Sequence, residues 1–376
     1  MKHRGILFSV IFIGFLILLY GHPVWFPQNS VDQGSTTEIR RDPPPTSWNY
    51  EPIATEGFAE WIGQDISDFN ESYGNPEESF SSGFSFEFHH YELDHEMHLE
   101  LTTENKVITS IKFLGNQDER LAPFFQGMTM NDLTKLTMVY PNFNIHYEGR
   151  TVGFELMEED MNYRPLIAFD NGSFAILFFS QKKNESTLSN VMYLSKEMLL
   201  KLAPYQITEG VIPKFTIEET ADWEVINQNK QNLSKHIFQY LRERDELSEF
   251  TLDITTQINS EQLLGRFFME AENLLTTERA QKLQRIQRGE LIETFSASSV
   301  ELEILLDELQ TSAKHAYLEL PIYDPTFTIL TWYSTPYLHT RFMHQEAESL
   351  GVAFSKENMV VLLEKLENQT EDSDEP

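Results

Sequence analysis

The chain of 376 residues contains no cysteine. This absence excludes disulfide bridges, thiol nucleophiles and zinc sites built on cysteine. Basic residues are also scarce, because 28 lysines and arginines stand against 59 aspartates and glutamates, for a formal net charge of −31. The net charge is +1 over residues 1–50, −16 over 51–210 and −16 over 211–376. No basic stripe offsets this acidity, so we do not expect the chain to bind nucleic acid.

The common catalytic motifs are missing as well. The sequence has no G-x-S-x-G, H-E-x-x-H, Walker loop or G-x-G-x-x-G pattern. What the chain does have is apolar material, with 40% hydrophobic residues and 28 phenylalanines. A chain of this length and composition predicts two domains, each with a packed core.

The N-terminus carries a membrane-targeting pattern. Lys2 and Arg4 precede an uncharged stretch of 22 residues from Gly5 to Phe26, and roughly 20 apolar residues suffice to span a bilayer as a helix. No A-x-A cleavage site and no lipobox cysteine follows it. We therefore expect residues 1–26 to be an uncleaved signal anchor with the body of the protein outside the cytoplasm. The alternative is a cleaved signal peptide and a secreted protein.

Two segments of low structural content flank the body. Residues 27–56 contain Pro43-Pro44-Pro45 among polar residues, which predicts a semi-stiff linker. At the other end, residues 366–376 form an acidic tail.

Residues 57–210 contain an internal repeat, with copies at about 62–115 and 126–195. Each copy starts with a glycine and a polar helix cap, continues into a short helix, and then alternates as strands do. The first copy turns as a hairpin around Glu104-Asn105, and the second around the polar run 181–186. One helix with several antiparallel strands in each copy predicts an α+β domain.

Four of the 11 histidines, His89, His90, His95 and His98, lie within ten residues. On a hairpin, neighbouring residues point to opposite faces, so these side chains do not all meet. One interpretation is exposed hairpin histidines. The other is a weak metal site or pH-sensitive patch that uses His90 with His95 or His98.

The stretch from Phe154 to Ile207, FELMEEDMNYRPLIAFDNGSFAILFFSQKKNESTLSNVMYLSKEMLLKLAPYQI, reads as strand, acidic turn, Arg-Pro, strand pair and short helix ending at Pro-Tyr. This succession resembles the CAP-associated domain, which precedes a CAP (SCP/PR1-like) domain in surface proteins of Bacillus-type bacteria. The resemblance implies a CAP-associated domain at 57–210 and a CAP-like α-β-α sandwich at 220–365.

The second domain carries weaker marks of the same family. Residues 222–244 and 260–275 are expected to be helices. Trp332, Ser334, His339 and Arg341 look like the family's W-x-x-S-x-x-H-R helix, with a shift of about one position. The Leu-Gly-Val-Ala run at 350–353 is similar to the strand that follows it in the family.

The resemblance implies a cleft with two histidines and two glutamates that holds a divalent cation. Here the corresponding positions are Arg266, Glu278, Glu319 and His339. An arginine cannot be a metal ligand, so the CAP-like domain is expected to be degenerate, without a metal or other cofactor. The four side chains are expected either to form an ion-pair cluster or to leave Glu278, Glu319 and His339 as the candidate cleft.

These features favour a non-catalytic protein that binds or scaffolds at the bacterial cell surface. Its partners would be the membrane, through the N-terminal helix, and a cell-envelope component or another protein. One alternative is a hydrolase of peptide or cell-wall material, in which the three cleft residues converge on one pocket. Another is a carrier of apolar ligands with a groove lined by Phe267, Phe268 and Tyr333.

Overall fold

A computed structural model describes residues 50–93, 97–115, 118–182 and 185–365. The expected anchor at 1–26, most of the linker and the acidic tail lie outside these ranges. The described residues belong to one compact unit. Within the described ranges, no helix combines the length and the apolar character needed to cross a bilayer.

The first part of the described chain alternates short helices with antiparallel strands. Its helices are η1 Gly57–Trp61, α2 Ile66–Tyr73, η2 Glu119–Leu121, α3 Met130–Leu136, α4 Glu158–Tyr163 and α5 Lys196–Leu202. Its strands are β1 Glu78–Ser81, β2 Glu87–Leu93, β3 Met97–Glu104, β4 Val107–Gly115, β5 Asn142–Tyr147, β6 Arg150–Glu155, β7 Leu166–Ala168, β8 Phe174–Lys182, β9 Glu185–Leu194 and β10 Gln206–Glu209. A seven-stranded sheet has the order β1-β2-β3-β4-β9-β8-β7, and β10, β6 and β5 form a three-stranded sheet. The two predicted copies therefore join edge to edge, where β4 pairs with β9.

The second part has longer helices around a smaller sheet. Its helices are α6 Trp223–Arg244, α7 Ile254–Leu274, α8 Thr277–Gln287, α9 Ser299–Leu309, α10 Pro325–Ser334 and α11 Pro336–Phe342. Its strands are β11 Phe295–Ser296, β12 Ala313–Leu320, β13 Ser349–Ser355 and β14 Asn358–Glu364. They pair as an antiparallel sheet of four strands in the order β11-β12-β14-β13. We call residues 57–210 the first half and residues 220–365 the second half.

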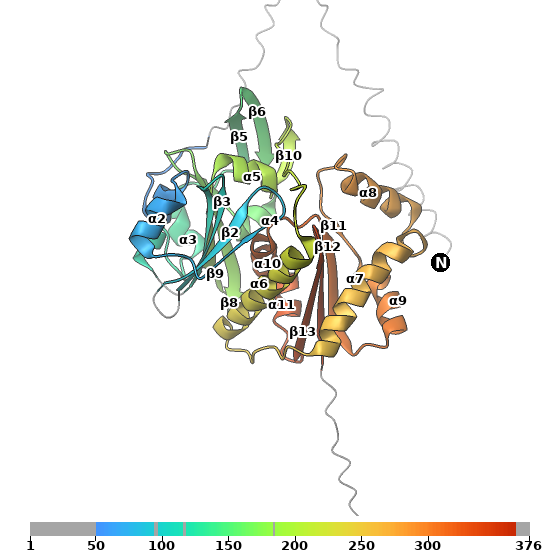
Figure 1. Ribbon diagram of the computed structural model, residues 1–376. Coiled ribbons are helices and arrows are strands. Elements are labelled where there is room, and N and C mark those ends of the chain that lie inside the picture. The colour runs from blue at the N-terminus through green and yellow to red at the C-terminus, as the bar shows by residue number, and fades with distance from the viewer. Residues whose placement is uncertain (1–49, 94–96, 116–117, 183–184, 366–376) are drawn as a thin grey trace, which may run out of the picture. The chain divides into compact units, whose positions relative to one another are not determined.

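The helices and the two larger sheets are stacked in layers (Figure 1). Helices α2 and α3 cover one face of the seven-stranded sheet, and α6 and α10 lie between that sheet and the four-stranded one. Helices α7 and α9 cover the far face of the four-stranded sheet. Helix α10 contacts β8 of the first half, and α6 contacts β13 of the second. The second half thus supplies the helices that cover the inner face of the first half's sheet.

One apolar core runs across both halves. Phe88 and Phe178 of the seven-stranded sheet, Ile237 of α6 and Leu350 of β13 belong to the same buried cluster. Strand alternation separates this cluster from the outer cores, since Ala353 of β13 faces α7 instead. Because the cluster is continuous, the two halves stabilise each other.

Side-chain caps fix where the long helices begin. Asp222, Asp253 and Asp324 each accept a hydrogen bond from the backbone N–H three residues ahead, at the starts of α6, α7 and α10. Pro325 then occupies the first turn of α10, where its missing N–H costs nothing. Ser298 forms a reciprocal capping box at the start of α9. Such caps typically contribute about 1 kcal/mol each.

The structure confirms the mixed α+β class and most of the elements on which it depended. Both predicted hairpins form, as β3–β4 and β8–β9. The first turns at Asn105 and Lys106, whose φ angles of 53° and 67° suit a tight hairpin turn. The helix expected at 222–244 is α6. The helix expected at 260–275 begins earlier, at Ile254, because Asp253 caps it there.

Candidate functional site at the junction of the two halves

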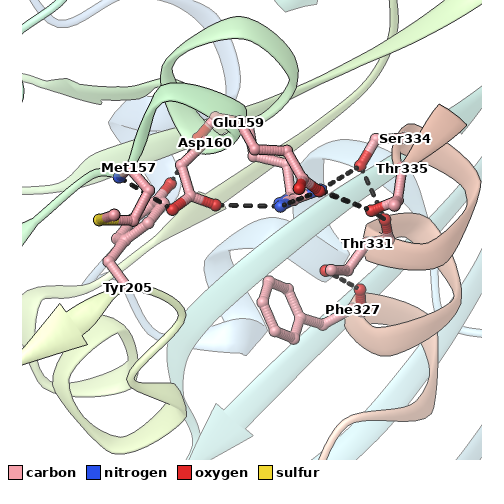
Figure 2. Close-up of polar contacts among 9 residues, drawn as sticks. Met157, Glu159, Asp160, Tyr205, Phe327, Thr331, Ser334 and Thr335 are labelled. Atoms are coloured by element: carbon pink, nitrogen blue, oxygen red, sulfur yellow. Dashed lines mark hydrogen bonds and ion pairs between the residues drawn. The ribbon is translucent and has the colours of Figure 1, made fainter. Parts of the chain in front are cut away.

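Arg164, in the Arg-Pro pair of the first half, forms a polar clasp onto the second half. Its side chain is only 12% exposed and its Nη2 lies 3.0 Å from Asp160 Oδ1. Its Nη1 donates to Thr335 Oγ1 at 2.8 Å and to Ser334 Oγ at 3.3 Å, at the end of α10. Figure 2 shows Asp160 on one side of this clasp and Ser334 and Thr335 on the other, and Glu159 Oε1 also lies 3.3 Å from Arg164 Nη2.

The Pro-Tyr pair near the end of the stretch 154–207 also contacts Arg164. Tyr205 donates its hydroxyl to the backbone carbonyl of Arg164 at 2.7 Å (Figure 2). Burial raises the pKa of Tyr205 well above its ordinary value, so the phenol stays a donor. The acidic turn, the Arg-Pro pair and the Pro-Tyr pair therefore meet in one structure. That structure grips α10, at the start of the segment that resembles the W-x-x-S-x-x-H-R helix.

A buried ion triad makes a second link between the halves. Lys112 of β4 lies 2.5 Å from Glu100 Oε1 of β3 and 2.5 Å from Asp324 Oδ2 at the start of α10, and the Lys112 and Glu100 side chains are 0% exposed. Thr326 also donates its hydroxyl to Glu100. Burial opposes the charge on Lys112, but the two carboxylates raise its pKa above the ordinary value, so the side chain is charged.

Glu319 of β12 lines a cavity at this junction. We call it the junction cavity, and its volume is about 140 Å³. It is also lined by Asp324, at the start of α10, and by residues 202–204 of the first half. The Glu319 carboxylate accepts hydrogen bonds from Ser296 Oγ at 2.9 Å and from Trp332 Nε1 at 3.4 Å. Burial raises the pKa of Glu319 although these two bonds oppose the effect. This position therefore holds a carboxyl group that protonates more readily than usual.

The other three expected positions engage elsewhere. His339 of α11 points its Nε2 at Asp245 Oδ2, 3.2 Å away, and its Nδ1 at the Tyr333 carbonyl, 2.8 Å away. Arg266 of α7 pairs with Glu308 of α9 at 3.0 Å. Glu278, in the first turn of α8, is exposed.

None of the hydrogen bonds or ion pairs found in the described residues joins any two of the four side chains. The expected four-residue ion-pair cluster does not form in these contacts. Burial alone would raise the pKa of Asp245, but its bonds to His339 and Tyr333 bring the pKa below the ordinary value. The His339–Asp245 pair therefore joins α11 to the end of α6.

The histidines of the first half lie elsewhere on the junction, beside α6. In the β2–β3 register, His90 faces Glu100 and His98 faces Glu92, so the two histidines share one face of the sheet. Both line a cavity of about 240 Å³ together with His236 of α6; we call it the histidine cavity. The described residues contain no group of three or more histidine, aspartate or glutamate side chains arranged to hold a metal ion. His95, the third residue of the predicted set, lies outside the described ranges.

The aromatic residues expected to line an apolar groove are core residues instead. Phe267 and Tyr333 are at most 3% exposed, and Phe268 packs against the outer core. A different cavity of about 150 Å³, next to the junction cavity, is lined by Ile212 and Phe215 of the segment between the halves and by residues of both halves.

Sequence reasoning missed the residues that join the halves. Lys112, Glu100 and His236 stand in amphipathic segments where a charged residue ordinarily points to solvent. One signal was available, since the pair Asp324-Pro325 is a typical helix start and places an aspartate at the start of α10. Nothing in the sequence says that this aspartate meets a lysine more than 200 residues away.

Comparisons with known proteins agree with this architecture. Residues 62–205 match the family model described as CAP-associated N-terminal. The uncharacterized membrane protein YlbC of Bacillus subtilis (strain 168) is 24% identical over 208 residues, which are 54% of this chain and 58% of that protein. The chain thus matches less than two thirds of the length of that relative.

Two solved structures share the fold. A cysteine-rich secretory protein (SAV1118) from Staphylococcus aureus aligns with a TM-score of 0.61 and 18% identity, over 84% of this chain and 95% of that one. An extracellular protein containing a SCP domain from Bacillus anthracis aligns with a TM-score of 0.59 and 16% identity, over 85% and 99%. Residues 62–205 of the chain therefore carry the CAP-associated N-terminal domain, and the chain shares its fold with these two proteins, one of which contains a SCP domain.

Proposed function

We propose that this protein is held to the membrane by residues 1–26 and acts outside the cytoplasm, by binding or scaffolding rather than by catalysis. The observation that carries the proposal is the separate engagement of the residues that would build the cleft of the family. Glu319 is held by Ser296 and Trp332, while His339 is held by Asp245 and a backbone carbonyl.

His339 illustrates why catalysis is disfavoured. A general base needs one ring nitrogen free to take a proton from substrate or water. Both nitrogens of His339 already face acceptors, the Asp245 carboxylate and the Tyr333 carbonyl. When protonated, the ring donates to both acceptors, which suits a structural contact better than proton transfer.

The names of similar proteins support the location. One relative is called a membrane protein, and the two structural neighbours are called secretory and extracellular. Together with the apolar run at 5–26, they favour a single-pass anchor with the body outside. Its partner would be a cell-envelope component or another protein, in keeping with the strongly acidic surface. A reporter fusion at the C-terminus, active only outside the cytoplasm, tests this topology, and an active cytoplasmic reporter would contradict it.

The main test combines metal content with thermal stability. The purified full chain is titrated with Zn²⁺, Ca²⁺ and Mg²⁺, and bound metal is measured with the unfolding temperature. We expect no stoichiometric metal and no shift. Stoichiometric metal that disappears in His339→Ala, but stays in the matched variant His146→Ala on β5, would refute the binding proposal.

A second candidate function has one observation in its favour. The raised pKa of Glu319, in a cavity shared with Asp324, is what a general acid of a hydrolase requires. This candidate predicts turnover of peptide or cell-wall polymer that is lost in Glu319→Gln and kept in Glu278→Gln, which changes an exposed glutamate. No turnover by the wild-type protein would leave binding as the function.

A further inference from the structure

The histidine cavity brings three imidazoles from three elements to one place. His90 of β2 is the innermost, with its side chain 23% exposed and its ring stacked on Phe80 at 5.9 Å between centroids. His98 of β3 is half-buried, and its ring lies 5.4 Å from that of His236, which stands exposed on α6. Solvent therefore reaches the cavity from the α6 side.

His90 Nε2 has no hydrogen-bond partner among the described residues. Its nearest carboxylate is Glu100 on β3, with Oε2 4.0 Å away. Glu100 is already committed, because it pairs with Lys112 and accepts the hydroxyl of Thr326. A charged His90 would therefore compete with Lys112 for the same carboxylate.

The charged groups that face the cavity come from each element packed around it. Glu77 lies just before β1, Glu78 begins β1 and Glu92 lies on β2, and all three are exposed at the rim. Lys112 of β4 is buried behind Glu100. On α6, the titratable group that lines the cavity is His236, with Tyr240 against the His98 ring at 6.0 Å.

We propose that the histidine cavity is an acid-sensitive contact, in which protonation of its imidazoles loosens β2 and β3 from α6 and disturbs the buried triad. Two positive rings at the distance of His98 and His236 repel each other. A positive His90 draws Glu100 away from Lys112, which leaves Asp324 as the one carboxylate that still balances the lysine. Because Asp324 lines the junction cavity, protonation in the histidine cavity also changes the ion pairing at the junction cavity.

The chemistry of His90 sets the range of pH. Burial, with Lys112, His236 and His98 nearby, lowers the pKa of His90 to about 4 although Glu78 opposes the effect. A free histidine has a pKa near 6.5, so the unfolded chain binds this proton first as the pH falls. The contribution of neutral His90 to the stability of the fold is therefore intact above about pH 6.5 and is lost progressively toward pH 4.

The test measures urea unfolding of the full chain between pH 7.5 and pH 5, together with hydrogen exchange. In the wild type, His90 alone should lower the folding equilibrium constant about thirtyfold over this range, and protection should fall first in β2, β3 and α6. His90→Gln should lose this thirtyfold component. His146→Gln, which changes an exposed histidine of β5, should behave as the wild type.

Three outcomes would overturn the proposal. The first is a His90→Gln profile parallel to the wild type, and the second is exchange that rises first outside β2, β3 and α6. The third is stabilisation by Zn²⁺ at pH 7.5 that disappears in His98→Gln, since a bound metal would keep the rings unprotonated. If His90→Gln does not fold, His236→Gln at the exposed rim is used, and it should flatten the profile by a smaller factor.

Discussion

Replacing Lys230 by methionine should stabilise the protein, although it removes a charged residue from the junction. Lys230 of α6 is 0% exposed, and its Nζ has no hydrogen-bond partner among the described residues. The ammonium lies 4.6 Å from the centre of the Phe84 ring and 5.7 Å from that of Trp223. Methionine has a similar length and fits among these rings without a charge.

The size of the effect follows from the pKa of Lys230. Burial lowers this pKa from 10.5 to about 7, against the attraction of Glu357 and Asp324. At about 1.4 kcal/mol per pKa unit, this difference lowers the free energy of unfolding by about 5 kcal/mol below pH 7. The attraction between the ammonium and the rings returns about 1–2 kcal/mol. We therefore expect Lys230→Met to raise the free energy of unfolding by about 3–4 kcal/mol at pH 6.

The sign of the pH dependence is fixed by the same values. Between pH 7 and 10.5 the unfolded chain holds the proton and the folded chain does not, so wild-type stability rises with pH through this window. The advantage of Lys230→Met should accordingly shrink by about 3 kcal/mol between pH 6 and pH 9. Urea unfolding followed by tryptophan fluorescence at both pH values measures it. Lys135→Met, at an exposed ion pair on α3, is the control and should change stability by less than about 1 kcal/mol.

Two results would refute this reasoning. One is a loss of stability in Lys230→Met at pH 6, which would mean that the ring contacts outweigh the cost of burying the charge. The other is a gain of the same size at pH 6 and pH 9, which would mean that Lys230 does not titrate near neutrality.

Three further substitutions test the junction by equilibrium unfolding. Asp324→Asn breaks the buried triad and should cost about 3–5 kcal/mol, and a loss below about 1 kcal/mol would contradict the burial of the pair. Arg164→Lys keeps the charge but loses the fork that binds four partners, and should cost about 1–2 kcal/mol, whereas Arg150→Lys, at the exposed first position of β6, should be neutral. Gly83 and Gly172 have similar φ angles of +80° and +84°. Gly83→Ala places a Cβ 2.4 Å from the Trp223 indole of α6, whereas the Cβ of Gly172→Ala meets open space. The first should cost at least about 2 kcal/mol more than the second, and equal losses would show that the indole moves aside.

Local structure was readable from the sequence where one segment supplies all the information. The hairpin at Asn105 has a turn residue between two alternating runs, and α6 has a cap and an apolar stripe. Helix α8 was not predicted, because its sequence TERAQKLQRIQ has a low apolar content and only Leu283 and Ile286 are buried. The early start of α7 depends on the cap at Asp253, outside the apolar pattern that predicted the helix.

The candidate site was less readable because its contacts join distant segments. The family resemblance pointed to Glu319 and His339 in one cleft, but a shift of a single position in a helix turns a side chain by about 100°. Asp245, which holds His339, and Lys112, which holds Asp324, have no sequence pattern that pairs them. The residues of the stretch 154–207 were recognised as a family mark, whereas their role in gripping α10 needed the structure.

The continuous core between the seven-stranded and four-stranded sheets has a consequence for how such proteins diversify. A family boundary near residue 205 marks a unit of inheritance, but folding does not respect that boundary, since α6 and α10 cover the inner face of the first half's sheet. Cutting the chain there would leave Phe88, Phe178 and their neighbours bare to water. Recombination between relatives would therefore succeed only when both halves that form the interface are inherited together. We expect the two halves to occur together in related proteins.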